Sequence, residues 1–89
     1  MKAPYLEITY RRGRPLAAYL YLDRGAGEKS ARTEPVGTAL LIDFTESGKP
    51  IGIEITNPRQ VDVTDLNQTL RKLGLPVLSD DESAPLRAA

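Results

Sequence analysis

Three carboxylates around one predicted turn are the residues best suited to chemistry. Asp43 and Glu46 lie at the start of a glycine-containing turn, and Glu54 lies on the strand expected to follow it. Carboxylate oxygens bind hard cations such as calcium or magnesium, and carboxyl groups also act as general acids and bases. Their spacing matches no known metal-binding loop, however, and carboxylates beside a turn are usually solvated. A carboxylate-based metal-binding protein or enzyme therefore stays an alternative, and we assign no catalytic residue, metal ligand or cofactor.

Three arginines within four positions form a second cluster, the arginine turn of Arg11, Arg12 and Arg14. Such side chains bind phosphate groups, and aromatic side chains beside them can stack on bases. The tyrosines on either side of this turn are Tyr5, Tyr10, Tyr19 and Tyr21. Three arginines are a short footprint, and charged residues in turns are most often solvated. The arginine turn is thus a candidate anion contact, and a nucleic-acid-binding accessory protein is a second alternative.

The composition excludes several classes of chemistry. The chain contains no cysteine and no histidine. It therefore lacks disulfides, thiolate nucleophiles and cysteine-based metal sites, and it lacks the side chain best suited to proton transfer near neutral pH. These absences predict a protein that is not an enzyme.

The charge distribution is uneven although the net charge is zero. Residues 1–32 carry seven Lys and Arg against three Asp and Glu, whereas residues 33–89 carry five against nine. This asymmetry can orient self-association, and the neutral total argues against nucleic acid as a partner. The sequence shows no signal peptide and no run of 18 uncharged apolar residues, so we expect a cytoplasmic protein without a membrane-spanning segment.

Alternating apolar residues and β-branched or aromatic runs predict a sheet, and 89 residues suffice for one domain. The predicted strands cover residues 5–10, 16–22, 30–34, 38–44 and 50–56. Pro35 confines the third strand to an edge or ends it. Gly48 suits the left-handed position of a three-residue loop between the last two strands. The strands are therefore expected to follow one another as antiparallel neighbours.

The register of the last hairpin is predicted by pairing Thr45 with Lys49. On one face this register sets Leu40, Ile42 and Phe44 beside Glu54, Gly52 and Pro50, and on the other it sets Ala39, Leu41 and Asp43 beside Ile55, Ile53 and Ile51. Both faces are then largely apolar, and Asp43 and Glu54 lie on opposite faces.

A ten-residue amphipathic helix is expected to begin near Thr64 and to stop before Gly74, which fits a left-handed helix end. Its buried stripe consists of Leu66, Leu70 and Leu73. Residues 79–89 are acidic and aperiodic, so we expect one domain over residues 1–78 and a flexible acidic tail over residues 79–89. The predicted class is α+β, an antiparallel β-meander of four to five strands with one C-terminal helix packed on one sheet face.

One short helix covers only one face of such a sheet, so the second face is expected to meet a partner. Tyrosine suits an interface because its broad apolar ring carries a polar tip. The candidate interface residues are Tyr19, Tyr21, Leu40, Ile42 and Phe44. The favoured function is therefore a non-catalytic protein-interaction or dimerisation module, a homodimer that also engages a small protein partner.

Three segments carry a family resemblance: residues 18–22, residues 31–36 and the hairpin from Leu41 to Ile55. The hairpin is the most specific, with an apolar-Asp-aromatic strand, a glycine turn and the sequence Gly-Ile-Glu-Ile. From about Tyr5 to Thr56 the chain resembles a family of small bacterial proteins catalogued as domain of unknown function 2283. The resemblance implies a β-meander with a helix and frequent self-association, and it offers no established activity or cofactor to carry over. The chain departs from that family in having the arginine turn where acidic residues are usual.

Overall fold

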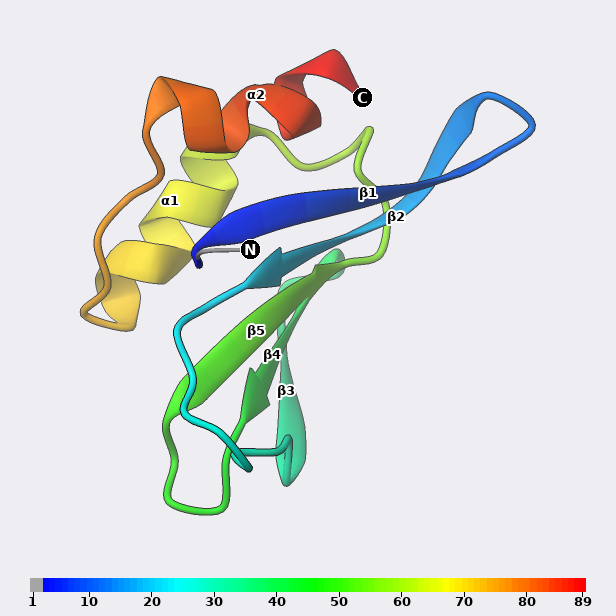
Figure 1. Cartoon of the computed structure of the whole chain (residues 1–89). Helices are drawn as coiled ribbons and strands as arrows, with labels where there is room; N and C mark the ends of the chain where they lie inside the picture. The colour runs from blue at the N-terminus through cyan, green and yellow to red at the C-terminus, as the bar shows by residue number, and fades with distance from the viewer. Residues whose placement is uncertain (1–2) are drawn as a thin grey trace.

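The computed structural model describes residues 3–89 as one five-stranded antiparallel sheet with two helices. The strands are β1 (Tyr5–Arg11), β2 (Arg14–Tyr21), β3 (Arg32–Val36), β4 (Leu40–Phe44) and β5 (Pro50–Ile55), and the helices are α1 (Val63–Lys72) and α2 (Asp80–Ala88). β1 and β2 form a hairpin, while β3, β4 and β5 form a meander whose last strand pairs with β2. The order across the sheet is β1-β2-β5-β4-β3, which confirms the predicted α+β class (Figure 1). However, β2 pairs with β5 and not with β3, so the expectation that the strands all follow one another as neighbours is wrong at this point.

The loop between β4 and β5 has the predicted form. The backbone N–H of Thr45 donates to the carbonyl of Lys49 at 2.8 Å, and the N–H of Gly48 donates to the carbonyl of Thr45 at 2.9 Å. Gly48 has a φ of 93°, a conformation that glycine adopts without steric cost. The hairpin is thus closed by the residues that the sequence indicates.

Beyond this loop, a β-bulge changes the register and corrects the prediction. Phe44 pairs with Pro50 as expected, but the ladder then shifts, and Asp43 pairs with Gly52. β5 has one extra residue at this point. Every later side chain of β5 therefore lies on the face opposite to the one that a regular ladder without the bulge would give it. The predicted neighbours of Leu40, Leu41 and Ile42 are therefore wrong by one residue.

The shifted register collects the apolar side chains of four strands on one face, the covered face. Two rows cross it, Leu6-Leu20-Ile53-Ile42 and Ile8-Ala18-Ile55-Leu40. Leu20, Ile53 and Ile55 have no solvent exposure, and they form one cluster with Leu66 and Leu70 of α1. Only this face is uniformly apolar, so the expectation of two largely apolar faces is wrong.

α1 begins two residues earlier than the sequence suggests. Its N-cap is Asp62 rather than Thr64, and Asp62 and Asp65 form a reciprocal capping box. The helix ends as predicted, because Gly74 has a φ of 74° and the N–H of Leu75 donates to the carbonyl of Leu70 at 2.9 Å. Leu66 and Leu70 are buried, and Leu73 packs at the edge of the same cluster.

α2 occupies the segment that was expected to be a flexible acidic tail, so that prediction is wrong. Ser79 and Glu82 form a capping box, and the acidic residues of the first turn face the positive end of the helix dipole. Leu86 is 4% exposed within the core cluster, and α2 contacts β1 (Figure 1). The burial of Leu86 explains why a short helix containing Pro85 is held in place.

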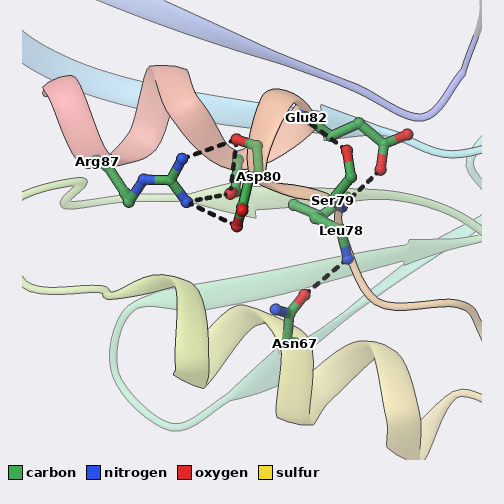
Figure 2. Close-up of polar contacts among 7 residues, drawn as sticks. Asn67, Leu78, Ser79, Asp80, Glu82 and Arg87 are labelled. Atoms are coloured by element: carbon green, nitrogen blue, oxygen red, sulfur yellow. Dashed lines mark hydrogen bonds and ion pairs between the residues drawn. The ribbon is translucent and has the colours of Figure 1, made fainter.

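Polar contacts tie the segment before α2 to α1 and also link residues within α2 (Figure 2). Asn67 of α1 accepts a hydrogen bond from the N–H of Leu78 at 2.9 Å, which ties α1 to the segment that leads into α2. The guanidinium of Arg87 donates to the hydroxyl of Ser83 at 2.7 Å and to the carbonyl of Asp80 at 2.8 Å. The domain therefore extends to α2 and is not confined to residues 1–78.

Candidate functional site

The open face is the side of the sheet opposite the covered face. Two rows of residues cross it, Tyr5-Tyr21-Gly52-Asp43-Thr33 and Glu7-Tyr19-Glu54-Leu41-Pro35. Among these ten residues, only Gly52 is buried. The open face thus combines three tyrosines with three carboxylates, and this mixture makes it the candidate functional site.

A hydrogen-bond network crosses the open face from β2 to β3. The hydroxyl of Tyr19 donates to Asp43 Oδ2 at 2.6 Å, and the hydroxyl of Thr33 donates to Asp43 Oδ1 at 2.6 Å. Burial, and then the hydrogen bond to Asp43, raise the pKa of Tyr19 well above its usual range. Through Asp43 of β4, the network ties β2 to β3 across the open face.

Gly52 makes this network possible. It lies on β5 between Tyr21 and Asp43, and the ring of Tyr19 passes directly over it. A Cβ atom at this position would collide with the hydroxyl of Tyr19. The strand therefore needs glycine here for close approach and not for its backbone conformation.

The three tyrosines of the open face contact one another. The rings of Tyr5 and Tyr21 stack with centroids 4.5 Å apart, and Tyr19 meets Tyr21 edge to face at 4.7 Å. The hydroxyl of Tyr21 points toward Glu7, and burial followed by the charge of Glu7 raises the pKa of Tyr21. This tyrosine cluster is a rigid, partly exposed aromatic surface.

The five predicted interface residues divide between the two faces. Tyr19 and Tyr21 lie half-buried on the open face. Leu40 and Ile42 are 6% and 4% exposed beneath the helices, so their prediction as surface contacts is wrong because the bulge was not foreseen. Phe44 lies on the covered face, where the guanidinium of Arg32 sits 4.6 Å from its ring centroid.

The three predicted carboxylates do not form one site. Asp43 and Glu54 share the open face, contrary to the predicted register, but both oxygens of Asp43 accept hydrogen bonds from hydroxyl groups. Glu46 is exposed in the loop between β4 and β5. Within residues 3–89, no group of three or more His, Cys, Asp or Glu side chains lies close enough to hold a metal ion. The geometry therefore gives no support to the carboxylate alternative.

The arginine turn is the tip of the β1–β2 hairpin, which projects from the rest of the molecule (Figure 1). Arg12 and Gly13 have φ values of 53° and 76°, as in a type I′ turn, and Arg11, Arg12 and Arg14 are exposed. Tyr5 lies six residues before Arg11 on an extended strand, a separation of about 20 Å. Of the four tyrosines proposed to flank the arginines, only Tyr10 lies near the tip.

An apolar pocket of about 250 Å³ was not foreseen from the sequence. Leu22 and Pro50 line it from the sheet, and Leu75, Pro76 and Val77 line it from the segment between the helices. Because that segment was expected to precede a mobile tail, no signal indicated a cavity there. Glu82 and Lys49 stand at its border, and Lys49 is already paired with Glu28 at 2.7 Å.

Over residues 3–89, no helix is both long and apolar enough to cross a membrane. Comparison with curated proteins and with solved structures finds no match. The family match runs from within β2 to beyond the end of β5 and so includes most of the open face, but it excludes the arginine turn. Residues 17–58 match the model of the family described as Protein of unknown function (DUF2283), which confirms the resemblance over this part of the chain, whereas residues 5–16 of the expected span lie outside the match.

Proposed function

We propose that the protein is a non-catalytic self-association module, in which the open face of one copy packs against the open face of a second copy. The observation that carries this proposal is the tyrosine cluster on a sheet face that neither helix covers. Sheets pack well face to face at about 10 Å, a gap that tyrosine side chains fill. Tyr5, Tyr19 and Tyr21 are also pre-ordered by their mutual contacts, so little side-chain entropy is lost on association.

The edges of the sheet are less suited to pairing with another chain than the open face. β3 is a five-residue edge strand that contains Pro35, which lacks a backbone N–H. At the opposite edge, β1 carries the charged residues Glu7 and Arg11, and charged side chains disfavour pairing at a sheet edge. Face-to-face packing is therefore favoured over edge-to-edge strand addition.

Sedimentation velocity over a concentration series tests this proposal. We expect the wild-type chain to dimerise and Tyr21→Ala to weaken dimerisation about tenfold or more, because interface tyrosines often dominate binding. Tyr10→Ala is the matched control, since Tyr10 is 53% exposed but lies at the hairpin tip outside the cluster. It should change the dissociation constant less than about twofold. A wild-type chain that stays monomeric at millimolar concentration would rule out the proposal.

A further inference from the structure

The arginine turn and the open face carry opposite charges that the fold keeps apart. The tip presents Arg11, Arg12 and Arg14, whereas the open face presents Glu7, Asp43 and Glu54. None of the salt bridges formed within residues 3–89 involves an arginine of the tip. These three positive and three negative charges thus form no ion pair within residues 3–89, although Asp43 accepts hydrogen bonds from the hydroxyls of Tyr19 and Thr33.

The strand geometry prevents the tip from folding back on its own acidic residues. Glu7 and Arg11 lie on the same strand four residues apart, a distance of roughly 13 Å along β1. Side chains alternate along a strand, so Glu7, Thr9 and Arg11 point to the same face. Because Arg11 pairs with Arg14 across the hairpin, Arg14 shares that face. The arginines are therefore displaced along the open face from the acidic residues but are aimed to the same side.

We infer that the arginine turn of one copy docks on the acidic tyrosine surface of a second copy, and that the contact is reciprocal. This inference rests on the proposed self-association and specifies its geometry. In this arrangement the open faces of the two copies face each other. The twofold axis runs midway between the two sheets, passes above Thr9 and is perpendicular to the strands, so β1 of the second copy runs in the opposite direction. Arg11 of each copy then lies opposite Glu7 of the other, since both residues are two positions from Thr9.

The same axis also brings Arg14, on β2, opposite a favourable part of the second copy. Thr9 pairs with Ala17, and Arg11 pairs with Arg14. Because a β-bulge lies between these two pairs, the three residue steps from Ala17 to Arg14 on β2 cover the same length as the two steps from Thr9 to Arg11 on β1. Arg14 of one copy thus lies opposite Tyr19 of the other, and Tyr19 is flanked in its row by Glu7 and Glu54. A guanidinium in this position meets an aromatic ring and two carboxylates, which together favour arginine.

Charge reversal at Glu7 and Arg11 tests this geometry. Glu7→Arg and Arg11→Glu should each weaken homodimerisation about tenfold or more, because like charges then face each other twice across the axis. Mixing the two variants should restore dimers, since each residue at position 7 or 11 of one variant then meets an opposite charge in the other. Native mass spectrometry resolves the mixed dimer from either homodimer by mass. Glu46→Arg and Arg59→Glu are matched controls, with the same charge changes at exposed positions away from the contact.

The outcomes separate this inference from the proposed function. A monomeric wild-type chain overturns both. If the wild type dimerises but both charge reversals leave dimerisation unchanged, only the reciprocal contact is overturned. Failure of the two variants to form the mixed dimer has the same meaning. The wild type can also be tested with a fluorescent 20-nucleotide oligothymidylate. If Arg11→Glu loses binding to this oligonucleotide but still forms the homodimer, the arginine turn is assigned to nucleic acid and the reciprocal contact is overturned. Raising NaCl from 0.1 M to 1 M should weaken a wild-type dimer of the inferred kind, because the Debye length falls from about 10 Å to about 3 Å.

Discussion

The covered face and the open face are built from alternate residues of the same strands, yet they differ in almost every physical property. On the covered face, aliphatic side chains from four strands meet α1 and α2 in one cluster. On the open face, three tyrosines lie beside three carboxylates, and a hydrogen-bond network links β2 to β3 above Gly52. This division indicates that the covered face supplies most of the folding free energy, while the open face combines a modest contribution to stability with surface for recognition.

Truncating a central residue of the covered face should have the largest effect. Ile53→Ala removes a side chain with no solvent exposure, and such changes lower the free energy of unfolding by about 2 to 5 kcal/mol. The neighbouring Glu54→Ala, on the open face, should change it by less than about 0.5 kcal/mol. Urea denaturation followed by circular dichroism at one protein concentration measures both, and equal losses would contradict the division between the faces.

Removing the side chain of Leu86 tests how far the stability of the covered face depends on α2. Leu86→Ala should lower the free energy of unfolding by about 2 to 3 kcal/mol, because the side chain is 4% exposed in the core. Leu16→Ala is the matched control, since Leu16 is 53% exposed and should contribute less than about 0.5 kcal/mol. An equally small loss for Leu86→Ala would mean that residues 79–89 behave as the tail that the composition suggests.

On the open face, Gly52→Ala should lower the free energy of unfolding by about 1 to 3 kcal/mol, because the new methyl group displaces the ring of Tyr19 from Asp43. In a Tyr19→Ala background the same substitution should be neutral or slightly stabilising, since glycine itself weakens a strand. A double-mutant cycle from thermal or urea unfolding gives the coupling between the two positions. Additive effects would show that Tyr19 does not lie over Gly52.

The strands and α1 could be predicted because their signals are local. Alternating side chains mark β2, Gly48 marks the loop between β4 and β5, and Gly74 marks the end of α1. The α+β class follows from these elements. Only the pairing of β2 with β5 needed information about contacts far apart in the sequence.

The register and α2 could not be predicted as reliably, for two physical reasons. The bulge beside Pro50 inserts one residue without a distinct local pattern, and it decides which residues share a face with Asp43. Ser79 and Glu82 form a capping box that was not recognised in the sequence, where the acidic, aperiodic composition of residues 79–89 favoured a tail. Leu86 stabilises α2 through tertiary contact, which composition does not reveal.

The candidate site was accordingly only half predictable. Tyr19 and Tyr21 were identified because tyrosines on one side of a strand stand out in the sequence. The role of Gly52 was not, because it depends on a side chain that reaches across from a neighbouring strand. Side-chain networks of this kind follow from register, so an error of one residue in β5 was enough to hide the site.

The smallest expected effect concerns the hydroxyl of Tyr19, which Tyr19→Phe removes while keeping the ring over Gly52. At neutral pH the loss of its hydrogen bond to Asp43 should lower the free energy of unfolding by about 1 kcal/mol. The pKa of Tyr19 is raised above its ordinary value of 10.0, mainly by burial and then by Asp43. Above pH 10 the unfolded chain therefore loses this proton before the folded chain does, and wild-type stability falls as the pH rises.

Tyr19→Phe lacks this titration, so the stability advantage of the wild type should be complete below pH 10 and should shrink above it. Urea unfolding at pH 7, 9, 10 and 11 measures the difference. The pKa of Tyr21 is also raised, but Tyr21 is present in both proteins, so its contribution largely cancels. Tyr10→Phe, at an exposed position, should follow the wild type at every pH. A constant gap between the wild type and Tyr19→Phe across this range would mean that the hydroxyl is not held against Asp43, and that the open face is less ordered than the covered face.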